Sequence, residues 1–115
     1  MIRNLCYLPR VLRSRGDVTA VDLVRESGFL ASPEGLMREV IEAVLAAEPQ
    51  LVDDWMRYSE DKRVSEGWYF KRGSENNNYL VGFYPGSLED SYTNQFAACA
   101  RYVEEEIKSI ATHAT

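Results

Sequence analysis

The chain has 115 residues, of which 45% are hydrophobic and 27% charged, and these values fit one globular domain with a core of its own. Its 18 acidic side chains outnumber the 13 basic ones, so the formal net charge is −5 at pH 7. Because an acidic surface repels phosphate groups and no apolar run approaches the ~20 residues that span a bilayer, neither a nucleic-acid ligand nor a membrane location is expected.

The first 16 residues differ from the rest of the chain in charge. They contain four arginines and no acid, whereas residues 17–115 hold nine basic and 18 acidic side chains. A targeting segment, an overlong start to the reading frame and a loosely attached arm all fit this pattern, although the apolar residues are too few for a secretory signal. Because terminal segments are commonly disordered unless they dock, we predict a loosely ordered basic arm at 1–16 and one α+β domain at 17–115.

Residue types that carry catalysis are sparse. The only histidine, His113, lies near the end of the chain without the partners of a Ser-His-Asp or Cys-His arrangement. The glycines match no nucleotide-binding loop, and Cys6 and Cys99 lack the spacing of a metal site or a disulfide framework. We therefore predict a non-enzymatic chain without catalytic residues, cofactor or metal, in a reducing and hence cytoplasmic compartment.

Three helices are predicted in the first half of the domain. Thr19 and Asp22 have the spacing of a capping box, and Gly28 is placed to end the helix that they begin. Ser32-Pro33 predicts the start of a second helix, because serine caps well and proline fits the first turn. Its apolar positions recur at helical spacing: Met37, Val40, Ile41, Val44 and Leu45. A third, short helix is expected over residues 50–58.

Residues 64–72 and 79–84 predict an antiparallel β-hairpin, because aromatic and β-branched residues dominate both runs and turn formers bound them. If paired residues have numbers that sum to 151, the apolar side chains share one face: Trp68, Phe70, Val81 and Phe83. On the other face a tyrosine then lies opposite each glycine: Tyr69 opposite Gly82, and Tyr84 opposite Gly67. A register shifted by one residue would lose this apolar face.

A final helix is predicted over residues 94–111, capped by Ser91 or Thr93. Its stripe of apolar residues has i+3 and i+4 spacing: Phe96, Cys99, Ala100, Val103, Ile107 and Ile110. The three glutamates 104–106 fall mostly off this stripe and are expected to face water. Because a lone hairpin is marginal in water, the helix should cover the apolar hairpin face. The predicted class is α+β, with the order α-α-α-β-β-α.

The functional prediction is a binding surface. Aromatic side chains anchor protein interfaces, and acidic ones steer basic partners toward them. The candidate partner-binding residues combine the two types: Tyr69, Tyr84, Glu89, Asp90, Asp53 and Asp54. The competing interpretation is that the acidic pairs are solvated edges and that the tyrosines only shield glycines. For Tyr69 and Tyr84 both interpretations stay open.

The stretches VSEGWYF and YLVGFYP, followed by NQFAACARYVEEEI, resemble small bacterial proteins of uncharacterised function. They are also similar in build to immunity proteins that neutralise contact-dependent-inhibition toxins. Those proteins are small, often acidic, α+β and non-enzymatic, and each binds one cognate toxin domain. The resemblance assigns no functional residue. It implies a cytoplasmic inhibitor that occludes a basic toxin active site by charge and shape.

Two other functions stay open. The chain could be an accessory domain that pairs with its own copy as a homodimer through the second hairpin face. It could also bind a small molecule in a pocket between the hairpin and the helices, using tyrosines and carboxylates. Fold and composition alone do not decide among these three functions.

Overall fold

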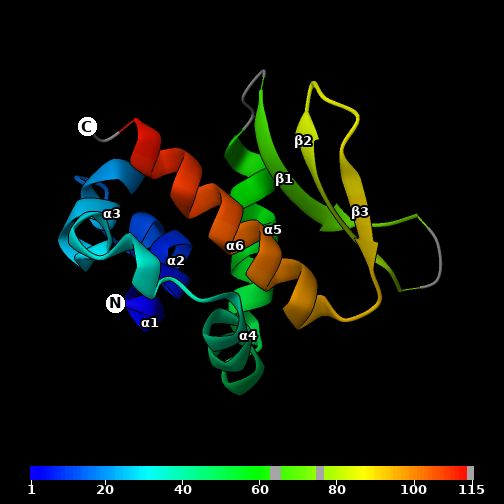
Figure 1. Ribbon diagram of the computed structural model, residues 1–115, viewed down its shortest axis with the longest axis horizontal. Helices are drawn as coiled ribbons and strands as arrows, with labels where there is room; N and C mark the ends of the chain where they lie inside the picture. Colours follow the sequence, from blue (N-terminus) through cyan, green and yellow to red (C-terminus); the bar gives the residue numbers. More distant parts are fainter. Residues whose placement is uncertain (63–65, 75–76, 114–115) are drawn as a thin grey trace.

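The structure is a computed structural model that describes residues 1–62, 66–74 and 77–113. Helices gather on one side of a three-stranded antiparallel sheet, and α6 crosses in front of α5 in Figure 1, with both helices next to β1. The elements in chain order are α1 Ile2–Cys6, α2 Leu8–Ser14, α3 Ala20–Ser27, the 3₁₀ turns Phe29–Ala31 and Pro33–Gly35, α4 Arg38–Ala47, α5 Gln50–Lys62, β1 Gly67–Arg72, β2 Tyr79–Tyr84, β3 Glu89–Tyr92 and α6 Gln95–Thr112. The predicted α+β class, with a hairpin packed on a C-terminal helix, is confirmed.

The N-terminal segment is part of the core, which corrects the expectation of a loosely ordered arm. Residues 2–6 and 8–14 form α1 and α2, and four of their apolar side chains are buried: Leu5, Cys6, Leu8 and Pro9. Two arginines of α2, Arg10 and Arg13, pair with Asp54 of α5. The segment docks because its few apolar side chains are buried in the core. Its four arginines form ion pairs with acidic side chains of the neighbouring helices and their ends.

The helix α3 follows its predicted signals at both ends. The Thr19 hydroxyl accepts the Asp22 amide at 3.1 Å, and the Asp22 carboxylate accepts the Thr19 amide at 3.0 Å, which completes the capping box. Gly28 ends the helix with φ of 88°, a left-handed conformation that glycine adopts without strain.

The second predicted helix begins later than expected. Ser32-Pro33 opens only a short 3₁₀ turn, and α4 starts at Arg38. Leu36 is buried in an extended conformation, so the chain leaves the helical path to insert this side chain into the core. The third predicted helix is α5, which continues past Tyr58 to Lys62. Residues 63–65, where the first strand was expected to begin, lie outside the described part of the chain.

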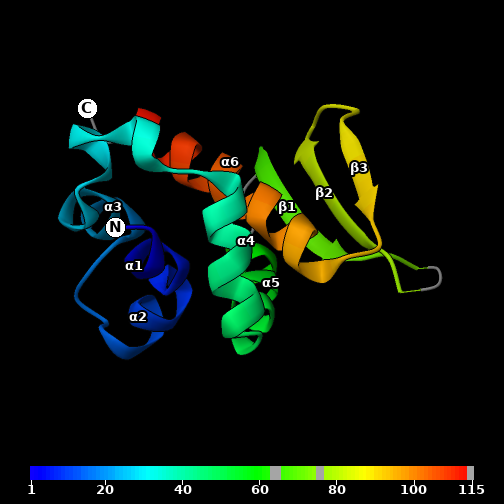
Figure 2. The ribbon, with the colours of Figure 1, turned by 60° about the horizontal axis from the view of Figure 1, so that its bottom comes forward.

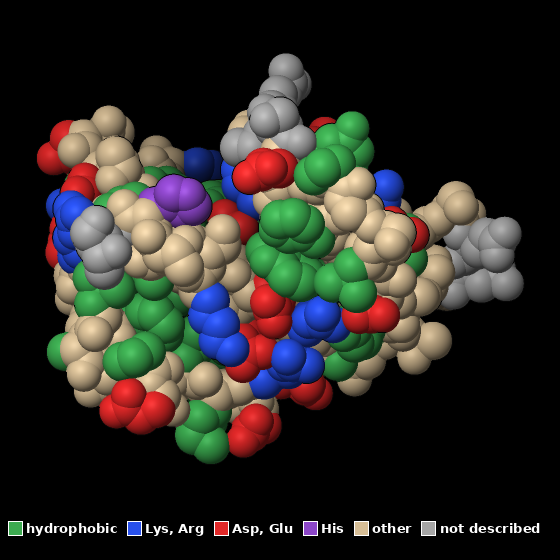
Figure 3. Space-filling view, turned by 45° about the horizontal axis from the view of Figure 1, so that its top comes forward, with side chains coloured by type: hydrophobic (Ala, Val, Ile, Leu, Met, Phe, Trp, Pro, Cys, Tyr) green, Lys and Arg blue, Asp and Glu red, His purple; other side chains and the backbone are tan. Residues whose placement is uncertain are grey.

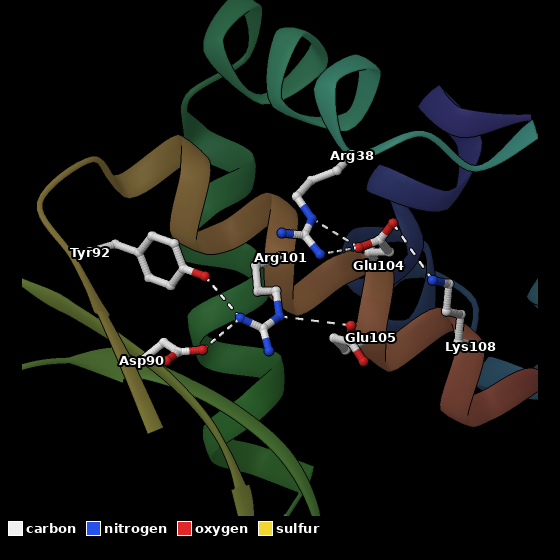
Figure 4. A network of polar contacts seen from close by, with 7 residues as sticks. All are labelled: Arg38, Asp90, Tyr92, Arg101, Glu104, Glu105 and Lys108. Atoms are coloured by element: carbon white, nitrogen blue, oxygen red, sulfur yellow. Dashed lines mark hydrogen bonds and ion pairs between the residues drawn. The ribbon is translucent and has the colours of Figure 1, made fainter. Parts of the chain in front are cut away.

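The hairpin has the predicted register, with Trp68 opposite Phe83, Phe70 opposite Val81 and Tyr69 opposite Gly82. The third strand was not predicted: β3 pairs with β2 along Glu89–Tyr92, and the cap of α6 is Asn94 instead of Ser91 or Thr93. The sequence of β3 has no alternation of apolar residues that could have predicted it. Polar contacts to α6 hold this strand in place (Figure 4).

The two faces of the sheet have different surroundings. Figures 1 and 2 show the described helices on one side of it only. The inner face, toward α6, carries Trp68, Phe70, Tyr79, Val81, Phe83, Asp90 and Tyr92. The outer face carries Tyr69, Lys71, Leu80, Gly82, Tyr84, Glu89 and Ser91. No helix in the described residues combines the length and the apolar character that crossing a bilayer requires.

Candidate functional site

The inner face of the sheet belongs to the core, as predicted. Phe70 and Val81 are fully buried, and Trp68 packs edge-on against Phe83 with ring centroids 5.5 Å apart. The guanidinium of Arg101, from α6, lies 5.5 Å from the centre of the Trp68 ring. Because these aromatic side chains serve packing, the functional question narrows to the outer face.

Tyr69 lies over Gly82 on the outer face. A Cβ atom at Gly82 would meet the Tyr69 ring and hydroxyl and would lie 2.5 Å from the Leu88 carbonyl oxygen. The Tyr69 hydroxyl donates a hydrogen bond to the Glu89 carboxylate. Partial burial, together with this carboxylate, raises the pKa of Tyr69 to about 12. The shielding interpretation therefore holds for Tyr69, which also fixes the position of Glu89.

Replacement of Gly82 by alanine is expected to lower the free energy of unfolding by about 1–3 kcal/mol, the usual cost of overpacking. The new methyl group would collide with the Leu88 carbonyl, a backbone atom that cannot move without disturbing the turn into β3. Urea unfolding followed by circular dichroism measures the loss. Gly16→Ala is the control, because nothing lies within 4 Å of a Cβ at that position. Equal stability of the two variants would contradict this packing.

Tyr84 differs from Tyr69 because solvent reaches most of it. It is 60% exposed at the end of β2, and Leu88, in the turn before β3, is 44% exposed. Tyr84 and Tyr69 together line a groove of about 710 Å³ between β1 and α5. Six further residues line it: Met56, Ser59, Glu60, Phe70, Lys71 and Arg72. Tyr84 thus belongs both to the exposed end of β2 and to the lining of the groove.

The edge of β1 beside this groove is closed by α5. The Phe70 amide donates to the Ser59 hydroxyl at 2.8 Å, and the Lys62 ammonium donates to the Trp68 carbonyl at 2.7 Å. Covering an edge with a helix prevents unwanted strand pairing. Ser59 and Lys62 thus fix β1, and with it Tyr69, against the helical layer.

The other predicted residues do not join Tyr69, Tyr84 and Glu89. Asp90 is on the inner face, where it accepts from Arg101 at 2.8 Å (Figure 4). Asp54 is buried between Arg10 and Arg13, so it is not available to a partner. Asp53 is exposed on α5, away from the sheet. The structure therefore groups three of the six candidates and gives Asp54 and Asp90 structural partners.

Sequence reasoning missed several residues of this surface. Met56 lines the groove from α5, although no pattern in its helix marks a groove. Lys71 and Glu60 line the groove although nothing in their local sequence marks them. The only available signal was the register itself, which places Lys71 on the same face as Tyr69.

The structure offers little for nucleophilic chemistry. Both cysteines are buried; burial raises the pKa of the Cys6 thiol to about 12 and that of Cys99 well above its usual range. Reactive thiols need the opposite shift. Within the described ranges, no group of three or more His, Cys, Asp or Glu side chains is placed to hold a metal ion.

Several charged side chains elsewhere are paired with one another. One face of the molecule carries interleaved acidic and basic side chains, with apolar ones to either side (Figure 3). On α6, Glu104 binds both Arg38 and Lys108 (Figure 4). A second groove of about 510 Å³ contains Lys62 and Glu106, which pair with each other at 2.8 Å. These satisfied pairs indicate structural roles, and the outer face stays the candidate site.

Comparison with known proteins adds no family: no family model matches the chain, and neither a curated protein nor a solved structure matches it. The resemblance to immunity proteins therefore stays a prediction.

Proposed function

We propose that this chain is a non-enzymatic module that binds a basic protein domain through the outer face of its sheet. The observation that carries the proposal is the exposure of Tyr84 beside a groove, on a face that no described helix covers. Exposed aromatic and apolar side chains next to a concave surface are typical of binding sites.

The charge of the chain supports a basic partner. The net charge is −5, so the long-range field attracts a positively charged domain and speeds its encounter. The Lys71 ammonium, which lies on the binding face, sits 5.3 Å from the centre of the Tyr69 ring. Lys71, Arg72 and Glu60 line the groove and Glu89 contacts Tyr69, so these local charges balance, and the attraction to a basic partner rests on the net charge of the chain.

The more specific form of the proposal is an immunity-type inhibitor of a toxin domain. It rests on the acidic charge, the lack of a catalytic constellation in the described residues, and the resemblance of residues around 60–110 to such proteins. The test is to mix the purified chain with any basic toxin domain that a neighbouring gene encodes. Complex formation at micromolar concentration, with loss of toxin activity, supports the proposal. Failure to form any complex refutes this form of it.

Replacement of Tyr84 by alanine is expected to weaken binding of that domain by at least about tenfold, the effect of losing an interface anchor worth 1.4 kcal/mol or more. Isothermal titration calorimetry measures the change. Because Tyr84 is mostly exposed, the free energy of unfolding should change by no more than about 0.5 kcal/mol.

Met37→Ala is the matched control for this variant. Met37 is an exposed apolar side chain before α4, remote from the sheet, so its loss should leave the affinity unchanged. An equal loss of affinity in both variants, or none in Tyr84→Ala, would exclude the outer face as the binding surface.

A small-molecule function is a second candidate, favoured by the volume of the groove and by the two tyrosines that line it. Its ligand would be an aromatic compound, which Tyr69 and Tyr84 can contact through their rings. A competition experiment distinguishes the two candidate functions. A compound that binds the groove but leaves the affinity for the basic domain unchanged would assign the groove and the protein-binding surface to different ligands.

A further inference from the structure

The two edges of the sheet differ in what lies beside them. The strand order is β1-β2-β3, so β1 and β3 are the edge strands. Side chains of α5 close the edge of β1: Ser59 accepts from the Phe70 amide, and Lys62 donates to the Trp68 carbonyl. In Figures 1 and 2 no described helix or strand lies beyond β3. The edge of β3 is therefore the open one.

The register of β3 defines which backbone groups this open edge presents. Asp90 pairs with Val81 and Tyr92 with Tyr79, and the Phe83 amide donates to the Leu88 carbonyl at 3.1 Å. In an antiparallel ladder, alternate residues direct their N–H and C=O groups toward the partner strand and away from it. The amides and carbonyls of Glu89 and Ser91 therefore point outward from the sheet.

The side chains of these two residues do not cap their own edge. Glu89 accepts from the Tyr69 hydroxyl, and the Ser91 hydroxyl accepts from the Asn78 side-chain amide at 3.0 Å. Both contacts run across the outer face, back toward β1 and β2. The outward backbone groups of β3 consequently stay accessible to another chain.

Arg101 holds β3 in place for such a partner. Its guanidinium donates to the Asp90 carboxylate at 2.8 Å and to the Tyr92 hydroxyl at 3.0 Å (Figure 4). Both residues are on the inner face of β3, so α6 fixes the strand through that face. The edge of β3 that points away from β2 stays open. A preformed edge reduces the ordering cost of adding a strand.

We propose that the open edge of β3 accepts an extended segment of the basic partner by strand addition, through backbone hydrogen bonds with Glu89 and Ser91. The inference rests on the proposed function and names its mode of recognition. Charge favours this occupant: the charged side chain that β3 carries on the outer face is the carboxylate of Glu89, whereas Asp90 is paired with Arg101 on the inner face.

The charge of Glu89 disfavours a second copy of this chain. An antiparallel β3–β3 pairing centred on Glu89 would place two glutamates opposite each other. Like charges directly opposite across strands are destabilising. A basic strand removes that repulsion and adds attraction, so the edge suits a foreign segment better than its own copy.

The experiment uses the full chain and a short, end-capped peptide of alternating lysine and valine, followed by NMR. We expect shifted amide signals and slower hydrogen exchange at Glu89 and Ser91. Ser91→Pro removes an outward donor without breaking the ladder to β2, since proline is tolerated at such edge positions. It should weaken peptide binding by at least about tenfold.

Ser91→Ala is the matched control, because it removes only the hydroxyl that Asn78 contacts and should keep the affinity for the peptide. A peptide of alternating glutamate and valine should not bind. Equal affinity of the peptide for wild type and Ser91→Pro would overturn strand addition. If Ser91→Pro fails to fold, hydrogen exchange in wild type decides: slower exchange at Glu89 and Ser91 with the peptide supports strand addition, and unchanged exchange overturns it. Concentration-dependent dimers of the free chain, detected by light scattering and lost in Ser91→Pro, would also overturn it in favour of the own copy.

The failure of strand addition can be told apart from the failure of the proposed function. A partner that binds wild type and Ser91→Pro equally but loses affinity in Tyr84→Ala would refute strand addition and leave the protein-binding function standing. If the partner binds Tyr84→Ala as tightly as wild type but loses affinity for Ser91→Pro, the outer face is refuted as the binding surface and the edge of β3 is retained.

Discussion

Replacement of Glu106 by alanine is expected to lower the free energy of unfolding by about 3–5 kcal/mol, the cost of breaking a buried ion pair by removing one partner. The Glu106 side chain is only 5% exposed. Its carboxylate accepts from the Lys62 ammonium at 2.8 Å and from the Tyr58 hydroxyl at 2.7 Å. Alanine would leave a largely buried positive charge and a buried hydroxyl without this acceptor.

If Lys62 moved into water in the Glu106→Ala variant, it would lose its other contacts. Its ammonium also donates to the Trp68 carbonyl at the edge of β1 and lies 5.7 Å from the centre of the Tyr102 ring. Withdrawal of Lys62 would open that edge. Because Glu106 and Lys62 together join α5, α6 and β1, the predicted loss extends to the sheet that carries the proposed binding surface.

Urea unfolding monitored by far-UV circular dichroism measures this effect. Asp61→Ala is the control, since it removes an exposed carboxylate from the end of α5 and should change stability by no more than about 0.5 kcal/mol. Glu106→Gln keeps the shape and one acceptor, so we expect a smaller loss than for alanine. A loss below about 1 kcal/mol for Glu106→Ala would show that the pair contributes nothing beyond an exposed salt bridge.

The hairpin could be predicted because its information is local. Trp68, Phe70, Val81 and Phe83 alternate with residues of the other face, and only one register keeps them together. The strand β3 has no such pattern. Its position depends on Arg101, which contacts Asp90 and Tyr92 from a helix that follows later in the chain. A strand held by such contacts leaves no periodic signal in the sequence.

Contacts between residues far apart in the sequence also explain why the surroundings of two acidic side chains were predicted wrongly. Glu106 was expected to face water with its two neighbours, yet it is buried because Lys62, 44 positions earlier, supplies the opposite charge. Asp54 was expected to bind a partner, yet Arg10 and Arg13 neutralise it. Sequence shows the sign of a charge but not whether a distant residue pairs with it. Tyr69, Tyr84 and Glu89 came together because the register of adjacent strands places them.

The N-terminal segment leads to the second large prediction, which concerns Trp55. This side chain is 0% exposed, and its indole N–H donates to the Cys6 carbonyl of α1 at 2.9 Å. It packs edge-on against Tyr58 and Tyr102, with ring centroids 5.3 Å and 5.9 Å away. Trp55→Ala is expected to lower the free energy of unfolding by about 3–5 kcal/mol, through a large cavity and the lost hydrogen bond.

Trp55→Phe separates these two causes. Phenylalanine fills most of the space but leaves the buried Cys6 carbonyl without its indole donor, for which we expect a loss of about 1–3 kcal/mol. Because this hydrogen bond joins α1 to α5, trypsin should also cleave at Arg10 and Arg13 faster in both variants than in the wild type, in proportion to the stability lost. Deletion of residues 2–14 without loss of stability would contradict the docking of α1 and α2. It would restore the loosely ordered arm that the charge pattern of this segment predicts.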